Sequence, residues 1–564
     1  MADRPRRVTL VADELLGYVR TGGIGTATTH LALGLARLGH DVEVLYAGDA
    51  HPFGDWHGVY ADAGVSIRHI ERSGERIEPG YLARARDVEL ALGANPPDVV
   101  VTQDLAAPAY TALRKRQLGL GFAGTLFVVY CHGTRRWVSD TAHKVRVLPG
   151  AHAVTLLEQA SVELADLVVC PSAYVLEWMR GEGWRVPPDS RVIPYLSRAA
   201  ATGAAVTRIS VPAERPRRIA FFGRIEERKG LRLFAAGINR LEPRSLAGVE
   251  LVFVGAATPA WPRERVLALL SEDAKATLRD ISFETGLDQP DALAFLSRDA
   301  TLAVMPSLGE TFSNAVYECL EHGIPFIATD AGAPRELVVA EDRAAVLFEP
   351  SADGVARALQ DALTRPLRAA RLAFDPSDAS AAWNDVVTHT RSPAAPLPAA
   401  DPDCVLRIRD DDVPAADLVE RLTVAQAATG ADVVTCGVRL PSGEGRLFIG
   451  DCGGLGAVTN AYGTVGLVRR ALLGEAPTDD WQLYARLAAG GATIVSIPEI
   501  LVESSRLPGD GVRDPETALA VAQEFERHLP PYARSLARLA AGLGAQAAQP
   551  ARTARRRLAT LLRR

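Results

Sequence analysis

The segment Leu302–Glu318, LAVMPSLGETFSNAVYE, decides the fold. Its first residues, Leu302–Met305, are typical of a buried strand, and after a short loop the chain continues with the spacing of a helix. Two carboxylates, Glu310 and Glu318, lie eight residues apart across this junction. The amides of Thr311–Asn314 are expected at the helix N-terminus, where free N–H groups favour an anion. The segment predicts a strand–loop–helix unit with an anion site at the carboxyl end of the strand.

The same unit recurs in both directions along the chain. Short runs rich in β-branched residues alternate with helical stretches, and this alternation stops near Pro194 and then begins again. Such alternation predicts parallel sheets covered by helices on both faces. The fold class is therefore α/β, with two domains that face a cleft. The predicted strands are Val8–Val11, Val42–Tyr46, Val99–Thr102, Leu126–Cys131 and Leu167–Cys170, then Ile219–Gly223, Leu251–Gly255, Ile281–Glu284, Leu302–Met305 and Phe326–Thr329.

Composition limits the classes of protein that the chain can belong to. Its 564 residues are 48% hydrophobic and 23% charged, which suits several globular domains rather than a disordered chain. The net charge of −6 argues against a basic coat for nucleic acid. Six cysteines without a CxxC pair argue against a disulfide framework or a zinc site and favour a reducing compartment. With no secretion-signal pattern and no long apolar stretch, we expect a cytoplasmic protein.

A second segment at a strand end carries two cations. Arg224 directly follows the predicted strand Ile219–Gly223, and Lys229 lies five residues further along. Ligands bind at the carboxyl ends of strands in open α/β sheets. A forked guanidinium and a point-like ammonium suit a diphosphate whose charge grows as it leaves. The alternative is a charged turn that merely faces solvent.

The carboxylates and the first glycine-rich turn have chemical and structural interpretations as well. Glu310 and Glu318 could accept hydrogen bonds from hydroxyls, which suits one sugar ring and one ribose. Alternatively they are a helix-terminal charge and a surface glutamate. The turn Gly22–Thr26 follows a strand and opens a helix, so its backbone N–H groups could approach an anion. Its alternative is an ordinary tight turn.

Residues 5–390 resemble the retaining GT-B glycosyltransferases of family 4, a group that includes glycogen synthases and bacterial mannosyl- and glucosyltransferases. The resemblance implies a GT-B fold of two Rossmann-like domains. The matching segments, in family order and spacing, are Gly22–Thr26, His40-Asp41-Val42, Arg224 with Lys229, Glu310-x7-Glu318, and Gly323-Ile324-Pro325 followed by Asp330-Ala331-Gly332.

The resemblance implies a nucleotide-sugar donor in the cleft, with no metal and no other cofactor. Arg224 and Lys229 would hold the diphosphate, Glu310 the sugar hydroxyls and Glu318 the ribose. Transfer would retain the anomeric configuration, through attack on the same face of the sugar from which the phosphate departs. The further phosphate-binding residues implied are Gly23, Thr311, Phe312, Ser313 and Asn314. His132 matches the family histidine that touches the donor sugar, although a lone histidine after a strand can also be structural.

Beyond this region the sequence predicts a linker over 393–402 and a smaller unit over 403–508. This third unit resembles the second half of a GT-A glycosyltransferase of family 2, through Arg409–Val413, Gly430–Val434 and Asp479–Leu483. The nucleotide-binding half of such a domain is missing, so we expect an accessory part that covers the enzyme, binds acceptor or mediates assembly. Its acidic residues can also be read as caps, Asp410–Asp412 before a helix near Ala415 and Asp479 before one from Trp481.

The predicted organisation follows from these boundaries: an acceptor domain over 1–200, a nucleotide-sugar domain over 201–372, a crossover helix over 373–392 that contains Trp383, the linker, the third unit, and a basic helical tail over 509–564. The tail has arginines beside leucines at helical spacing, so it could contact the inner face of a membrane or stay in solvent.

The predicted activity is transfer of a hexosyl group from a nucleotide-diphosphate sugar to a hydroxyl of a glycan, lipid or small molecule. One alternative is a GT-B-shaped epimerase, which would act on the nucleotide sugar without an acceptor. The other is a scaffold that binds sugar or a partner enzyme without catalysis. The loops Thr102–Ala107 and Arg135–Asp140 are expected to hold the acceptor.

Overall fold

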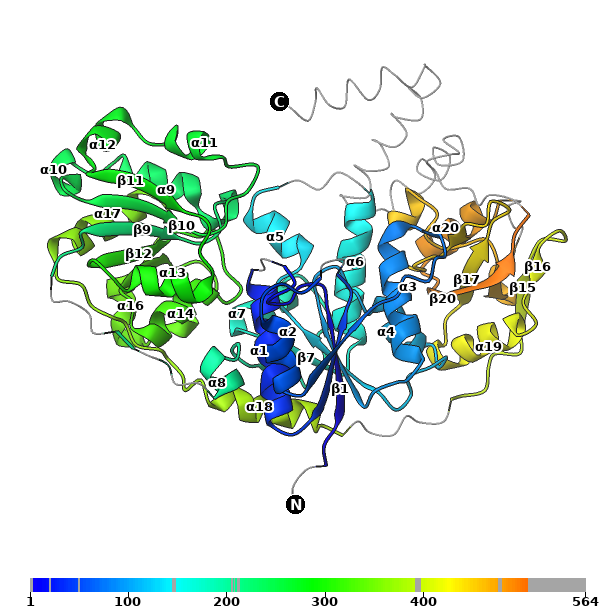
Figure 1. Cartoon of the computed structure of the whole chain (residues 1–564). Helices are drawn as coiled ribbons and strands as arrows, with labels where there is room; N and C mark the ends of the chain where they lie inside the picture. Colours follow the sequence, from blue (N-terminus) through cyan, green and yellow to red (C-terminus); the bar gives the residue numbers. More distant parts are fainter. Residues whose placement is uncertain are drawn as a thin grey trace, which may run out of the picture.

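The computed structural model of the chain describes residues 4–19, 22–48, 51–144, 149–203, 206, 208–209, 214–390, 397–474 and 479–505. Figure 1 shows two larger α/β bodies beside one another, with a smaller body on the far side of the first. The predicted tail, 509–564, lies outside the described residues. No helix within the described ranges is long and apolar enough to cross a membrane.

The first domain is built on a seven-stranded parallel sheet in the order β3-β2-β1-β5-β6-β7-β8. Its strands are β1 (Arg7–Ala12), β2 (Asp41–Tyr46), β3 (Val65–His69), β5 (Val99–Gln103), β6 (Leu126–Tyr130), β7 (Leu167–Cys170) and β8 (Arg191–Val192). Its helices are α1 (Gly23–Arg37), α2 (Trp56–Asp62), α3 (Gly80–Gly93), α4 (Tyr110–Gln117), α5 (Arg135–Thr141), α6 (Pro149–Leu164), α7 (Ala173–Gly181) and α8 (Arg198–Thr202).

Both faces of this sheet are buried, because alternate residues of each strand enter different cores. Val99 and Val101 of β5 pack in the same cluster as Leu31 of α1. Val100, between them, packs with Leu113 of α4 on the other face. This explains why the central strands are continuous apolar runs rather than alternating ones.

The middle domain repeats the design with a six-stranded parallel sheet in the order β11-β10-β9-β12-β13-β14. Its strands are β9 (Arg218–Phe222), β10 (Glu250–Val254), β11 (Asp280–Glu284), β12 (Thr301–Met305), β13 (Phe326–Thr329) and β14 (Leu347–Phe348). Its helices are α9 (Leu231–Ile238), α10 (Pro243–Leu246), α11 (Arg263–Leu267), α12 (Glu272–Thr277), α13 (Gln289–Leu296), α14 (Asn314–His322), α15 (Pro334–Leu337), α16 (Ala340–Val346) and α17 (Ala352–Thr364).

The strands predicted for both sheets are confirmed, each to within one residue at its ends. The predicted α/β class with parallel sheets is therefore correct, and two Rossmann-like domains side by side form a GT-B arrangement. One segment expected as a loop is helical instead: Arg135–Asp140 belong to α5. Residues 198–202 form a further helix, α8, which packs on α1. Ser197 and Thr134 cap these two helices with their side-chain oxygens.

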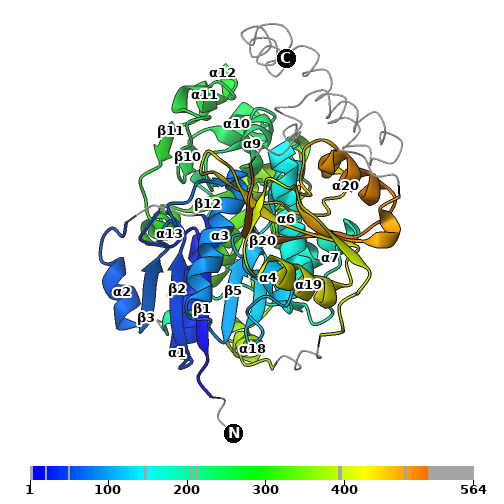
Figure 2. The ribbon, with the colours of Figure 1, turned by 90° about the vertical axis from the view of Figure 1, so that its right-hand side faces the viewer.

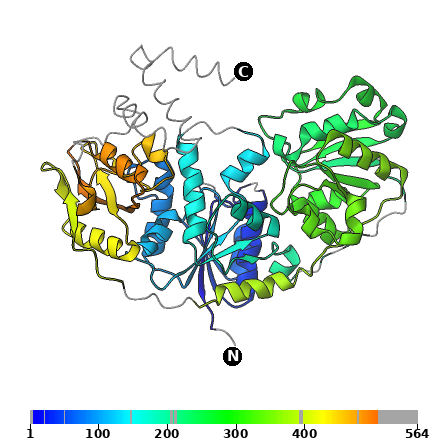
Figure 3. The same cartoon turned by 180° about the vertical axis from the view of Figure 1, so that it is seen from behind.

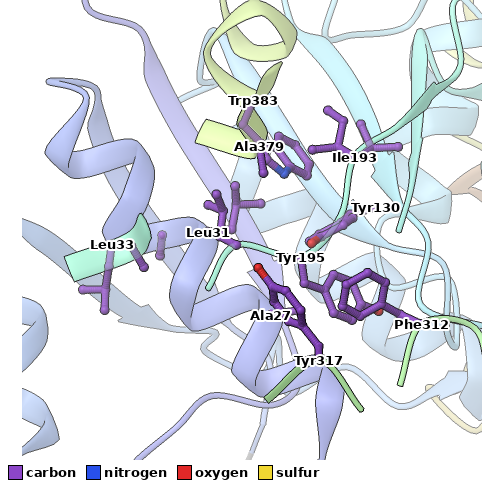
Figure 4. Close-up of a cluster of buried hydrophobic side chains, with 14 of the residues drawn as sticks. Ala27, Leu31, Leu33, Tyr130, Ile193, Tyr195, Phe312, Tyr317, Ala379 and Trp383 are labelled. Atoms are coloured by element: carbon purple, nitrogen blue, oxygen red, sulfur yellow. The ribbon is translucent and has the colours of Figure 1, made fainter. Parts of the chain in front are cut away.

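Helix α18 (Asp378–Val387) returns from the middle domain to the base of the first, as Figure 3 shows from behind. Asn384 of α18 hydrogen-bonds His40 in the first domain, with Oδ1 and Nε2 3.0 Å apart. Trp383 is fully buried, and its ring meets Tyr130 edge-on at 4.8 Å between centroids. Figure 4 shows that side chains of the first domain, the middle domain and α18 share this cluster.

The third unit does not stand apart from the first domain. Its strands are β15 (Cys404–Arg407), β16 (Val413–Pro414), β17 (Val433–Arg439), β18 (Gly445–Arg446), β19 (Gly466–Arg469) and β20 (Ile494–Glu503), and its helices are α19 (Leu418–Thr429) and α20 (Asp480–Ala489). β4 (Ile77–Glu78) of the first domain joins this sheet by pairing with β18. Figure 2 shows the sheet beside α3, α4 and α6. The two bodies therefore share a sheet as well as a core.

One predicted helix start in the third unit is wrong, and the other is confirmed. Pro414 lies in the edge strand β16, and α19 begins only at Leu418. Asp412 caps no helix there: its Oδ1 accepts a hydrogen bond from the Ser504 hydroxyl at 2.9 Å. Asp479 does cap α20, because its side chain accepts from the backbone N–H of Gln482.

Replacing Trp383 with alanine should destabilise the fold by about 3–5 kcal/mol, because the fully buried indole leaves a cavity where three parts of the chain meet. The free energy of unfolding from urea titration is the measurement. Val413→Ala serves as control, since Val413 is 63% exposed and its truncation should change stability by less than about 0.5 kcal/mol. A similarly small change for Trp383→Ala would show that α18 does not hold the domains together.

Candidate functional site

A cavity of about 350 Å³ lies between the first and middle domains. It is lined by residues from the segments that follow β1, β5, β6, β8, β9 and β12. Since the carboxyl ends of parallel strands from both sheets meet here, the cavity lies where open α/β folds bind ligands. The predicted site residues that line it are Gly23, His132, Arg224, Lys229, Glu310, Thr311, Phe312, Ser313 and Asn314.

The two predicted cations lie on one edge of this cavity. Arg224 follows β9, its side chain is 45% exposed, and its nearest acidic partner, Glu226, is 3.8 Å away. Lys229 ends the short 3-10 helix η1 (Glu227–Lys229), and its side chain is largely buried. Burial lowers the pKa of Lys229, an effect that the neighbouring Glu310 opposes. The pair offers one guanidinium that can reach a ligand and one ammonium fixed in place.

Glu310 is the carboxylate that fixes Lys229. Its Oε1 accepts from Lys229 Nζ at 2.5 Å and from the Ser307 hydroxyl at 2.6 Å, and Arg228 Nη1 lies 3.6 Å from Oε2. Burial pushes the pKa of Glu310 upward, but Lys229 and Arg228 outweigh burial and leave it below the ordinary value. Glu310 is thus ionised and surrounded by cations.

Helix α14 points its N-terminus into the same cavity. Its N-cap, Ser313, has φ of 75°, a left-handed conformation that is rare for a residue with a Cβ. Ser313 makes no side-chain cap hydrogen bond, so the N–H groups of the first turn have no side-chain acceptor at this position. Free N–H groups at a helix N-terminus are suited to phosphate oxygens.

The glycine-rich turn of the first domain lies close to Arg224 and to Asn314, the first residue of α14. A Cβ on Gly22 would lie 2.7 Å from Arg224 Nη2, and one on Gly23 would lie 2.9 Å from Asn314 Nδ2. Asn314 Nδ2 donates to the carbonyl of Gly23 at 3.4 Å. The two glycines therefore let the ends of the Arg224 and Asn314 side chains of the middle domain lie directly against the turn.

His132 lies on the first-domain side, directly after β6. Its Nδ1 is 2.8 Å from the Tyr195 hydroxyl, while Nε2 is buried and has no hydrogen-bond partner among the described residues. Burial lowers the pKa of His132 to about 3, so the ring is neutral. A neutral imidazole with one unsatisfied nitrogen at a cavity wall is suited to hydrogen-bond a neutral hydroxyl.

Glu318 is the one predicted site residue that does not line this cavity. It lies one turn into α14 and lines a neighbouring cavity of about 590 Å³. Both cavities are lined by Asn314 and Tyr195, so they adjoin. Gln289, at the start of α13, donates a side-chain hydrogen bond to Glu318, and burial raises the pKa of Glu318 to about 7.

Several residues that hydrogen-bond the predicted site residues were not predicted from the sequence. Ser307 and Gln289 each hold one of the two glutamates, and Tyr195 holds His132. No sequence pattern marks Gln289 or Tyr195 as a partner of a site residue. Only Ser307 could have been singled out, because it lies three residues before Glu310. In the described parts of the chain, no group of three or more His, Cys, Asp or Glu residues is placed to hold a metal ion.

Comparisons with known proteins agree with this arrangement. Residues 21–195 match the family model described as Glycosyltransferase Family 4, and residues 216–365 match the model described as Glycosyl transferases group 1. The MMP α-(1→4)-mannosyltransferase of Mycolicibacterium hassiacum is 27% identical over 372 residues, which are 60% of this chain and 85% of that protein.

Solved structures are similar to the chain over about two thirds of its length. Sucrose-phosphate synthase from Thermosynechococcus elongatus is 18% identical with a TM-score of 0.49, over 68% of this chain and 96% of that one. Anabaena HepE in complex with UDP and glucose is 15% identical with a TM-score of 0.43, over 67% of this chain and 94% of that one.

The two α/β domains with a cavity between them form an arrangement of the GT-B type. The chain is a glycosyltransferase, since its first and middle domains each match a glycosyltransferase family model and it has a mannosyltransferase relative.

Replacing Glu318 with glutamine should raise the melting temperature more at pH 8 than at pH 5. The folded pKa of about 7 lies above the ordinary 4.5, so the unfolded chain releases this proton first as pH rises. The carboxyl therefore costs stability progressively from about pH 4.5 to above pH 7, and the amide does not titrate. Calorimetry of both proteins at both pH values gives the difference. An equal difference at the two values would contradict the raised pKa of Glu318.

Proposed function

We propose that the protein is a retaining glycosyltransferase that moves a hexosyl group from a nucleotide-diphosphate sugar to an acceptor hydroxyl. One observation carries the proposal: Arg224, Lys229, the N-terminus of α14 and the glycine-rich turn surround a single cavity. Two cations, helix-end amides and a close-packed glycine turn are the groups that bind a diphosphate. Glu310 adds a carboxylate suited to sugar hydroxyls at the same place.

The residues of the cavity account for the departure of the diphosphate. As the bond to the sugar breaks, negative charge grows on the phosphate oxygens, and groups already oriented toward that charge stabilise the transition state. Lys229 is oriented before a donor binds, because Glu310 and burial fix its ammonium. Arg224 is more exposed and can move onto the phosphates.

The remaining predicted residues take complementary parts. Glu318, which is hydrogen-bonded by Gln289, lines the cavity next to the proposed diphosphate site and is suited to the ribose hydroxyls. The nucleoside would therefore extend into this larger cavity. His132 Nε2 would bind a donor-sugar hydroxyl from the opposite wall. In the proposed reaction the leaving phosphate accepts the proton of the acceptor hydroxyl as that hydroxyl attacks the same face of the sugar.

The choice of sugar is supported by the relative whose name specifies mannosyl transfer in an α-(1→4) linkage. We therefore propose a mannosyl donor as the first to test. A thermal-shift screen of UDP, GDP, ADP and dTDP would identify the nucleotide base of the donor, because a ligand that binds only the folded protein raises its stability.

For the third unit we propose an accessory role. Asp480, the acid before Trp481 that a GT-A enzyme would use, pairs with Arg407 at 3.1 Å and with Arg409 at 3.4 Å. Both of these contacts occupy the carboxylate with side chains of its own unit, which suits a structural role for Asp480.

Replacing Lys229 with alanine should weaken binding of the nucleoside diphosphate by about 10- to 100-fold, equivalent to the loss of one charge-assisted hydrogen bond. Isothermal titration calorimetry with the nucleotide that the screen identifies measures this change in affinity. Lys275→Ala removes the same charge from the same domain, where Lys275 pairs with the exposed Glu272, and should leave affinity unchanged. Equal affinities for Lys229→Ala and wild type would refute the diphosphate assignment.

Transfer from an α-linked nucleotide sugar should yield an α-linked product. The reason is that attack on the same face as departure preserves the configuration of the anomeric carbon. The one-bond carbon–proton coupling at that carbon, read by NMR at early reaction times, distinguishes the two anomers. A β-linked product would exclude retention while leaving the donor site intact.

A further inference from the structure

The wall of the cleft on the first-domain side is made by two segments that follow neighbouring strands. Leu105 follows β5, and His132 and Gly133 follow β6; all three line the cavity. Trp137, from α5, lines the same wall. Under the proposed function this side faces the sugar and the acceptor, because the diphosphate is held by the middle domain opposite.

Two buried carboxylates lie behind this wall and bind its backbone. Asp104 Oδ1 accepts from the N–H of His132 at 2.9 Å, and Oδ2 accepts from the N–H of Gly133 at 3.0 Å. Glu158, on α6, has no exposed surface. Its Oε1 accepts from the N–H of Ala106 at 2.8 Å, and its Oε2 accepts from the N–H of Arg135 at 2.9 Å. One carboxylate thus connects the segment after β5 to the first residue of α5.

The segment that Glu158 holds has an unusual backbone. Ala106 and Ala107 both have positive φ, at 63° and 49°, in the left-handed region that residues with a Cβ rarely adopt. Such conformations persist only where surrounding groups hold them. The hydrogen bond from Ala106 N–H to Glu158 is a contact of this kind, since it fixes the first of the two residues from outside the segment.

Helix α6, which carries Glu158, is covered on its other side by the third unit. Ala153 and Leu157 of α6 pack in one core with Leu455, Val458 and Tyr462 of the third unit. The same core includes Ile77 of β4, the strand that joins the two bodies. The third unit therefore packs against the helix that carries Glu158.

We propose that Glu158 is a positioning residue for the acceptor side of the cleft, and that the third unit serves to hold α6, and so Glu158, in place. The role in positioning acceptor rests on the proposed function. The other part of the proposal, that Glu158 fixes residues 104–107 and the start of α5, rests only on its hydrogen bonds. The order of these two segments can be measured without any substrate.

The test is amide hydrogen exchange of the full chain carrying Glu158→Gln. A glutamine keeps one acceptor oxygen but presents an NH₂ group to the second backbone N–H, so one of the two segments loses its partner. Exchange should rise by about tenfold in peptides that cover residues 104–107 or 134–138 and stay unchanged in the middle-domain sheet. Glu163→Gln is the matched control: it makes the same change on α6, where Glu163 pairs with the exposed Arg185, and should alter neither segment.

The panel of UDP, GDP, ADP and dTDP supplies the second measurement. Nucleotide binding by Glu158→Gln should equal that of the wild type, because Arg224 and Lys229 are untouched. Unchanged exchange in both wall segments, a rise spread evenly over all three sheets, or a loss of nucleotide binding would each overturn the proposal. A wild-type protein that binds none of the four nucleotides would instead refute the proposed function, while the exchange result would still decide the part played by Glu158.

A second variant tests the third unit without touching Glu158. Leu455→Ala removes apolar contact with α6 and should raise exchange in the peptides covering 104–107 by a smaller factor than Glu158→Gln. Val419→Ala, in the same unit but 56% exposed, should leave them unchanged. Unchanged exchange of residues 104–107 in Leu455→Ala would remove the third unit from the proposal.

Discussion

The buried ion pair between Lys229 and Glu310 is the interaction on which the site depends. Removing two charges from water costs several kcal/mol per ion, and mutual attraction repays this only when the geometry is good and further hydrogen bonds are present. Here Ser307 and Arg228 supply the further contacts. Because Glu310 directly follows the loop after β12 and Lys229 follows β9, the pair also ties the loops of adjacent strands together. The site is thus ordered before any ligand binds.

This ordered centre is joined to the first domain by a small set of polar contacts. The Thr311 hydroxyl donates to the carbonyl of His132 at 2.8 Å, and the Ser172 hydroxyl donates to the carbonyl of Thr311 at 2.6 Å. Glu336 accepts from the first two backbone N–H groups of α7 and so acts as a cap supplied by the other domain. Thr311 therefore hydrogen-bonds both the segment after β6 and the N-cap of α7, and Asn314 and Glu336 add further contacts between the two domains.

How much of this was predictable depends on the range of the interaction. Strands followed from local runs of apolar residues, and the grouping of Arg224, Lys229 and Glu310 followed from the rule that parallel strands end at one edge. The pairing of β4 with β18 links residues more than 360 positions apart, and no local pattern signals it. Pro414 misled because proline is as compatible with an edge strand as with a first helical turn.

Glu158 and Asp104 were missed for a different reason. A glutamate in a helix usually faces solvent, and only its place four residues before Val162, on the side that proves to be buried, sets this one apart. Both side chains are held by backbone N–H groups, and the ion pair of Glu158 with Arg135 is long, at 4.0 Å, so complementary charge in the sequence does not mark their main partners. The site residues that could be predicted are those proposed to bind ligand, and the ones that could not are those that bind the backbone of the chain itself.

The third unit is held against the first domain by ion pairs as well as by apolar packing. Lys115 Nζ, on α4, lies 2.9 Å from Glu89 of α3 and 2.6 Å from Glu499 of the third unit. Glu499 also pairs with Arg421 of its own unit. Breaking a largely buried network of this kind leaves a charge uncompensated, which is far more costly than losing surface contact. Removal of the third unit would expose β4, the core around α6 and the Lys115–Glu89 pair at once. We therefore expect the first domain and the third unit to fold as one body, with the hinge of the enzyme confined to the connections between the first and middle domains.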